Sequence, residues 1–317
     1  MTDNTVRAAI GQEPVALCMD HAAQLLALQV TPDAAAGQEG PAAQDSGGVR
    51  IERGERFAIH RGVGIVPVSG VLTPNAEIYE RFFGWATYAG LANSVTELAA
   101  NEDVGAIVLV MDTPGGLVLG IQMAAEAIAA ARAVKPVHIL VKHMALSAGY
   151  WLASQGSDIT VTPGSWVGSI GVAVTTHAFV QPGVSSGVQF FDLSSTHARA
   201  KLPNASTDEG RAEIQRRLDQ MESNFHAAVA AGRNIPLTDL TARLSVTDDP
   251  RDGGALFWGQ EAIDRGLADR AETDVMFWSR MFDQYSPRPQ AGRGKSARVS
   301  AAAARAGAAA AKARAAI

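Results

Sequence analysis

Ser147 is the residue of this chain best placed by its surroundings to act as a nucleophile. It lies in the stretch Met144–Trp151, M-A-L-S-A-G-Y-W, after a short apolar run at Val137–Val141 and before an apolar run with a helical pattern. A serine at a strand-to-helix turn lies near the first unpaired N–H groups of the helix, where negative charge is favoured. Acyl transfer needs such a place, with an exposed nucleophile beside donors for an oxyanion. A serine that merely caps the helix fits the same residues.

A second stretch predicts a similar unit some thirty residues earlier. Ala106–Met111 is a fully apolar run, typical of a strand buried on both faces. It leads into Asp112–Gly116, D-T-P-G-G, where Pro and two Gly residues allow a sharp turn with bare N–H groups. Val118–Ala131 then has a helical pattern. Two strand–turn–helix units side by side would place the glycine N–H groups opposite Ser147, although an ordinary tight turn also fits Pro-Gly-Gly.

Together with a third stretch, these motifs resemble the S49 serine peptidase family. The motifs are D-T-P-G-G at 112–116, L-S-A-G-Y-W-L-A at 146–153 and V-G-S-I-G-V at 167–172. The resemblance extends from about Gly62 to about Ala271, and it includes G-Q-E-A-I-D-R-G-L-A-D at 259–269. The family includes signal peptide peptidase A and the head-maturation proteases of tailed phages, and the chain looks more like the phage type.

The fold class predicted from the residues themselves is α/β. Strand and helix patterns alternate from residue 63 to residue 172, which favours a core of largely parallel strands. The family resemblance implies something more particular, a Clp-protease/crotonase-like spiral of ββα units.

The resemblance also implies the catalytic groups. The family uses a Ser–Lys dyad, and its lysine follows the G-S-I-G-V strand. Here that segment is Phe190–Pro203, F-F-D-L-S-S-T-H-A-R-A-K-L-P, which has no clean Gly-x-x-Lys. Lys201 is therefore the predicted base, with Lys142 second and a surface role as the alternative for Lys201. Lys135, before a proline at a strand start, is expected to be solvated.

The oxyanion donors are implied by the same resemblance. They are the backbone N–H groups of Gly115, Gly116 and Ala148. Ser169 is a candidate for a group that orients the lysine, and a plain turn serine is the alternative.

The chain divides into three predicted parts: an N-terminal arm and linker at 1–48, a peptidase domain at 49–286 and a basic tail at 287–317. The arm is predicted to hold a helix at Pro14–Val30 and a linker at Thr31–Gly48. The tail carries seven basic residues, no acidic ones and much alanine. We interpret it as a disordered docking or cleavable tail, with a solvated appendage as the alternative.

Composition restricts the classes of function. The 317 residues include one cysteine, Cys18, so no intrachain disulfide can form and a reducing compartment is expected. No run of eighteen apolar residues and no secretory signal pattern is present, which predicts a location in the host cytoplasm or a phage prohead. The tail has no aromatic residues for base stacking, so specific nucleic-acid binding is not expected. No cofactor and no metal site are predicted.

The predicted function is a serine endopeptidase that cuts phage capsid or scaffold proteins, or itself, and that forms a homo-oligomer. The alternative is a catalytically inactive member of the same fold with a role in capsid assembly or with the scaffold. Acyl-CoA chemistry on a crotonase-like fold is disfavoured by the serine in L-S-A-G-Y.

Overall fold

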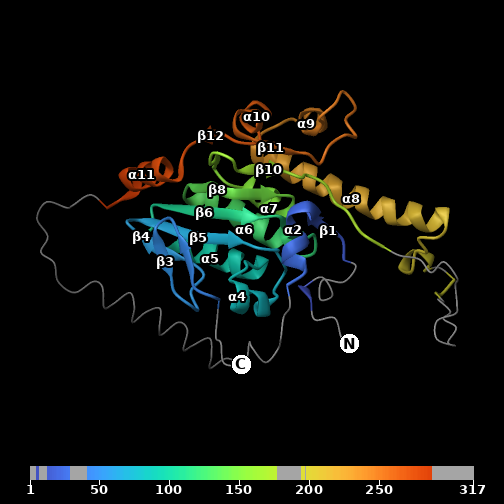
Figure 1. Ribbon diagram of the computed structural model, residues 1–317, viewed down its shortest axis with the longest axis horizontal. Helices are drawn as coiled ribbons and strands as arrows, with labels where there is room; N and C mark the ends of the chain where they lie inside the picture. Colours follow the sequence, from blue (N-terminus) through green and yellow to red (C-terminus); the bar gives the residue numbers. More distant parts are fainter. Residues whose placement is uncertain (1–4, 7–12, 29–40, 177–193, 197, 288–317) are drawn as a thin grey trace, which may run out of the picture. The chain divides into compact units, whose positions relative to one another are not determined.

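The computed structural model describes residues 5–6, 13–28, 41–176, 194–196 and 198–287 (Figure 1). Within these residues, eight strands form the main sheet, in the order β11-β10-β8-β6-β5-β4, with β9 paired to β8 and β12 paired to β9. The strands are β4 (Ala58–His60), β5 (Val63–Ser69), β6 (Ala106–Thr113), β8 (Val137–Leu146), β9 (Asp158–Val161), β10 (Trp166–Gly168), β11 (Leu256–Trp258) and β12 (Arg270–Ala271).

The inner strands of this sheet are parallel, and β4 and β11 join its two edges antiparallel. The predicted α/β class with largely parallel strands is therefore confirmed. β8 is the strand at which the sheet divides: its first part pairs with β9, and its last three residues pair with β10. This division leaves the end of β8, directly before Ser147, next to the end of β10 and the loop that follows it.

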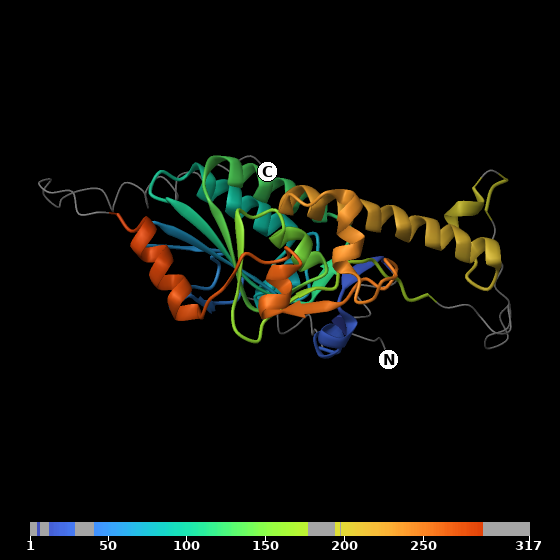
Figure 2. The same cartoon turned by 90° about the horizontal axis from the view of Figure 1, so that it is seen from above.

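Helices cover both faces of the sheet, which explains why the run Ala106–Met111 of β6 is apolar at every position. Ile107 and Leu109 of β6 pack in the core beneath α5 (Tyr88–Ala100) and α6 (Ile121–Val134). The intervening Val108 and Val110 pack on the opposite face with residues of α11 (Asp274–Tyr285). Figure 2 shows α11 and the α5–α6 layer on opposite sides of the strands.

Two helices, α7 (Ala148–Ala153) and α8 (Asp208–Arg233), pack against each other on the C-terminal side of Ser147 in the sequence. α7 follows Ser147, and α8 is capped by Thr207, whose Oγ1 accepts from Gly210 N at 3.0 Å. Phe225 of α8 stacks on Trp151 of α7, with ring centroids 4.7 Å apart. Two short helices complete this region: α9 (Leu237–Leu244) and α10 (Gly259–Asp264).

The N-terminal arm differs from the prediction. The single helix expected at Pro14–Val30 is wrong in its first part, because Val15–Leu17 forms strand β1 and the helix α2 covers only Met19–Leu26. Helical spacing of apolar residues was a local signal, and pairing of β1 with β7 (Gly115–Leu117) overrides it. α2 and β1 bury Leu17, Ala22 and Leu26 against residues around the short helix α4 (Glu77–Phe83).

The predicted linker is also structured at its end. Gln44–Ser46 (β2) pairs antiparallel with Val49–Ile51 (β3), so the hairpin crosses the expected boundary at residue 48. Gly47 and Gly48 both have positive φ, 60° and 72°, as a two-residue hairpin turn requires. The rest of the linker, residues 31–40, and nearly all of the predicted basic tail lie outside the described residues. Among those described, no helix is long and apolar enough to span a bilayer.

Candidate active site

Ser147 stands on a strained turn between β8 and α7. Its backbone has φ 53° and ψ −119°, a region that residues other than glycine rarely adopt. Two hydrogen bonds hold it there: Ser147 N donates to Gly168 O at 2.8 Å, and Ser147 O accepts from Trp151 N at 3.0 Å. The predicted strand-to-helix turn is thus present, and its geometry is fixed by the neighbouring strand as well as by the helix.

The Ser147 hydroxyl does not act as a helix cap. The residue occupies the N-cap position of α7, but its side chain makes no cap hydrogen bond. Its Oγ is buried and has no hydrogen-bond partner among the described residues. Ser147 also lines a cavity of ≈ 710 Å³, together with residues of β1, the loop after β10, α8 and the loop before β11. A buried hydroxyl without a partner costs stability, so this arrangement points to function.

The two glycines of the Pro-Gly-Gly segment are required by close backbone packing. A Cβ on Gly116 would lie 2.0 Å from Leu72 O. Gly115 has φ 108°, and a Cβ there would lie 2.2 Å from Ala16 O and 3.0 Å from the Cβ of Ser147. The expected tight turn is in fact the short strand β7, and it brings the glycine pair against the serine.

The three predicted oxyanion donors differ in their surroundings. Gly115 N already donates to Thr113 Oγ1 at 3.1 Å, a bond that shapes the turn. Gly116 pairs with Ala16 of β1. Ala148 is the first residue of α7, so its N–H has no acceptor within the helix.

The candidate lysines lie on exposed segments. Lys201 is exposed at the end of a single 3₁₀ turn, Arg199–Lys201, and Lys142 is exposed on β8 five residues before Ser147. Within the described residues no hydrogen bond joins either lysine to Ser147. The expectation that Lys135 is solvated is wrong, because its Nζ donates to two backbone carbonyls at the end of α5, Leu98 O at 3.2 Å and Asn101 O. Residues 177–193 of the segment before Lys201 are outside the described residues.

Ser169 lies at the cavity, one residue beyond β10. It has a positive φ of 52°, its N–H donates to Ala255 O at 2.8 Å, and it lines the cavity with Ser147. No hydrogen bond to a lysine accompanies it in the part of the chain that the structure describes.

Two polar residues of α8 reach the cavity and were not singled out by the sequence. Glu222 and His226 both line it, and Glu222 Oε1 lies 3.5 Å from where a Cβ of Gly171 would be. Burial lowers the pKa of His226, while the charge of Glu222 opposes the shift. Their spacing of four places them on one face of the helix, but only the packing of α8 shows which face meets the cavity. No group of three His, Cys, Asp or Glu suited to a metal ion occurs among the described residues.

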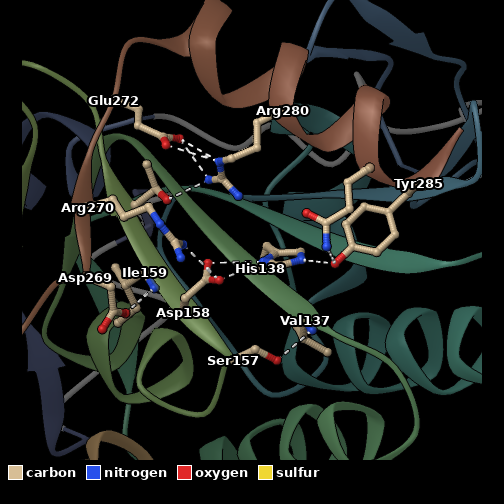
Figure 3. Close-up of polar contacts among 12 residues, drawn as sticks. Val137, His138, Ser157, Asp158, Ile159, Asp269, Arg270, Glu272, Arg280 and Tyr285 are labelled. Atoms are coloured by element: carbon tan, nitrogen blue, oxygen red, sulfur yellow. Dashed lines mark hydrogen bonds and ion pairs between the residues drawn. The ribbon is translucent and has the colours of Figure 1, made fainter.

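A second polar cluster lies at the other end of β8 (Figure 3). His138 Nδ1 contacts Asp158 Oδ2 at 3.0 Å, and its Nε2 contacts the hydroxyl of Tyr285 at 2.9 Å. Arg270 Nη1 lies 3.1 Å from the same Asp158 oxygen. Burial by itself would raise the pKa of Asp158, but the hydrogen bonds and charges of His138 and Arg270 outweigh it and hold that pKa below its ordinary value. Here every polar group has a partner, and the cluster joins α11 to the sheet.

Comparison with known proteins agrees with the serine site. Residues 129–283 match the family described as Peptidase family S49. This segment of the chain belongs to peptidase family S49. This segment includes the end of β8, Ser147 and the β10 loop, so the family match contains the candidate nucleophile.

Two curated relatives come from phages. The chain is 33% identical over 215 residues to the capsid assembly protease C of Escherichia phage lambda, covering 67% of this chain and 47% of that protein. It is 30% identical over 218 residues to the head-tail preconnector protein GP5 of Enterobacteria phage P21, covering 67% of this chain and 41% of that protein. The chain thus spans less than half the length of these relatives.

Among solved structures, an enoyl-CoA hydratase/isomerase family member has a TM-score of 0.37 at 19% identity, covering 72% of this chain and 73% of that one. This likeness is too low to carry an argument about overall structure or chemistry.

Proposed function

We propose that this S49 family member is a serine endopeptidase in which Ser147 attacks the carbonyl carbon of a peptide bond. The observation that carries the proposal is the Ser147 hydroxyl, which is buried on a strained turn beside the Gly115–Gly116 segment and has no partner in the part of the chain that the structure describes. A fold that leaves a hydroxyl unpaired and a backbone strained needs a compensating role for both.

In this mechanism the oxyanion formed by the attack is stabilised by backbone N–H groups. The two proposed donors, Gly116 N and Ala148 N, come from two different elements, β7 and α7. Gly115 contributes mainly by shape, because its own N–H is bonded to Thr113 Oγ1. Removing one oxyanion donor typically costs about 3 kcal/mol in the barrier. The acyl-enzyme ester is then hydrolysed by water, which regenerates Ser147.

The attack needs a base that takes the Ser147 proton and passes it to the leaving amine. We assign this role to Lys201, because the family resemblance places the lysine in its segment and because Lys135 is held at the end of α5. Lys201 acts as a base only when its amine is neutral, which requires removal from water. Its exposed position therefore means that its segment must move toward the cavity when substrate binds.

The substrates we propose are phage capsid or scaffold proteins, in line with the name of the lambda relative. They would be met in the host cytoplasm or in an assembling head, by an enzyme that acts as a homo-oligomer. The exposed Lys201 also favours a second candidate, a catalytically inactive member that retains the fold for capsid assembly.

The test is intact-mass analysis after incubation with an unfolded model protein, comparing the wild type with Ser147→Ala, Lys201→Ala and, as a matched control lysine, Lys142→Ala. We expect cleavage by the wild type and Lys142→Ala, and none by the other two variants. If only Ser147→Ala and Lys142→Ala are inactive, the peptidase assignment stands and the base is Lys142. A wild type that cuts neither this protein nor its own chain favours the inactive assembly protein.

A further inference from the structure

Strand β1 is hydrogen-bonded on both of its edges, next to Ser147. On one side it runs antiparallel to β7, where Cys18 N donates to Pro114 O at 2.8 Å and Val118 N donates to Pro14 O at 3.2 Å. On the other side Val15 and Ala173 exchange two bonds, of 3.0 and 2.9 Å. We call the space between these two backbone edges, Gly115–Leu117 and Ala173, the strand site.

The strand site places a main-chain carbonyl of the arm at the candidate oxyanion donors. In an antiparallel ladder, hydrogen-bonded pairs alternate with non-bonded ones. The bonds at Pro14 and Cys18 therefore make Ala16–Gly116 a bonded pair, in which Gly116 N faces Ala16 O. Ala16 O and the Cβ of Ser147 lie 2.2 and 3.0 Å from the same point, the position of a Cβ on Gly115.

The side chains of β1 also fill part of the cavity at the nucleophile. Val15 and Leu17 line it together with Ser147, the loop after β10 and α8. An extended peptide with any sequence has the same backbone N–H and C=O groups as β1, and it would find the same partners on both edges.

We propose that β1 is an internal occupant of the strand site, and that an extended peptide substrate must displace Val15–Leu17 before its carbonyl reaches Ser147. The proposal rests on the proposed peptidase function. Two observations favour an occupant over a bond awaiting cleavage: no described residue places a base within hydrogen-bond distance of Ser147 Oγ, and Lys201 is exposed.

The arm is built so that β1 can leave while its anchor remains. The anchor is α2, whose Ala22 and Leu26 pack in a cluster that includes Val71 and Trp85. β1 itself is only three residues long. A tethered segment competes at an effective concentration of millimolar order, so dilute unstructured peptides are cut slowly. A substrate that brings its own docking contacts overcomes this competition.

Cys18 provides a reporter of β1 release that does not depend on catalysis. It is the one cysteine of the chain, it directly follows β1, and only 8% of it is exposed. Its reaction with a thiol reagent is slow while β1 is paired and becomes faster when β1 leaves the strand site.

The experiment compares Ala16→Pro with Ala16→Ser as the matched control, in the Ser147→Ala chain and in the chain that keeps Ser147. Proline removes the Ala16 N–H from the β7 ladder, and serine keeps it. In the Ser147→Ala chain we expect Ala16→Pro to raise the Cys18 reaction rate on the order of tenfold, as loss of a buried backbone hydrogen bond does to an opening equilibrium. Excess casein, used as an unfolded protein, should raise the Cys18 reaction rate of the Ser147→Ala chain that has no change at Ala16.

In the chain with Ser147, Ala16→Pro should raise the initial rate of casein cleavage several-fold, and Ala16→Ser should not. If casein leaves the Cys18 rate unchanged, β1 is not displaced by peptides and the proposal is overturned, even when casein is cleaved. Cleavage of the wild type between Ala16 and Leu17 also overturns it, because β1 is then a substrate. If casein speeds the Cys18 reaction but no chain cleaves it, β1 is the occupant and the peptidase function fails.

Discussion

The two ends of β8 carry two buried polar sites that differ in whether their polar groups have hydrogen-bond partners. At one end His138 is 6% exposed, and both of its ring nitrogens have partners. At the other end Ser147 is fully buried, and its hydroxyl has none among the described residues. A satisfied polar cluster stabilises the fold, whereas an unsatisfied one lowers stability and is retained for another reason. The contrast separates the structural site from the candidate catalytic site without reference to the residue types.

The largest effect on stability is expected from Asp158→Asn. This change removes the negative charge between His138 and Arg270, which lie 3.0 and 3.1 Å from it, and weakens the hydrogen bond of the buried His138 as well as the ion pair of the partly exposed Arg270. We expect the free energy of unfolding to fall by about 2 kcal/mol in urea titrations at neutral pH, with peptidase activity retained. An unchanged midpoint would mean that the cluster in Figure 3 does not hold α11.

Asp158→Asn should also change how the free energy of unfolding depends on pH. Because the folded state holds the pKa of Asp158 below its ordinary value of 3.8, the charge contributes fully to stability above about pH 4. That contribution is lost as the pH falls through the lower folded-state pKa. Urea titrations between pH 5 and pH 2 should therefore show a steeper loss for the wild type than for Asp158→Asn. Parallel curves for the two proteins would contradict this account.

Ser147→Ala should stabilise the fold, whereas Asp158→Asn should destabilise it. It removes a buried hydroxyl that no described residue pairs with, so we expect the free energy of unfolding to rise by about 1 kcal/mol while cleavage is lost. Ser147→Gly tests the other cost, because glycine also relieves the positive φ of 53°. Both are measured by thermal and urea unfolding, and a destabilised Ser147→Ala would show that the hydroxyl is paired after all.

The smallest effect on the free energy of unfolding is expected at an exposed His–Asp pair. His143 Nδ1 lies 2.8 Å from Asp112 Oδ2, with side chains 62% and 40% exposed. Water and salt screen such a pair, so His143→Gln should change the free energy of unfolding by less than about 0.5 kcal/mol. A loss as large as that of Asp158→Asn would mean that burial does not explain the difference between the two His–Asp pairs.

Part of the fold could be predicted because its signals are local. The apolar run of β6 and the helix after the Pro-Gly-Gly segment, α6, were predicted and are present. The turn at Ser147 was predicted too, because the spacing of a strand, small residues and a helix is written in consecutive residues. The roles of Ser147, Lys201, Gly115, Gly116, Ala148 and Ser169 stay proposals, and the variants above test those of Ser147 and Lys201.

The tertiary structure decided what depends on contacts between distant segments. Nothing within Pro14–Val30 shows that Val15–Leu17 will pair with β7, one hundred residues later, in preference to the helix its spacing favours. In the same way the packing of α8 on Trp151, and not its own pattern, places Glu222 and His226 at the cavity. The sequence by itself determined the central strands β6 and β8, the helix α6 between them and the nucleophile turn, since each follows from short-range pattern. Only the tertiary structure decided what lies against that nucleophile, because backbone pairing is almost blind to sequence and depends on which edges the fold leaves open.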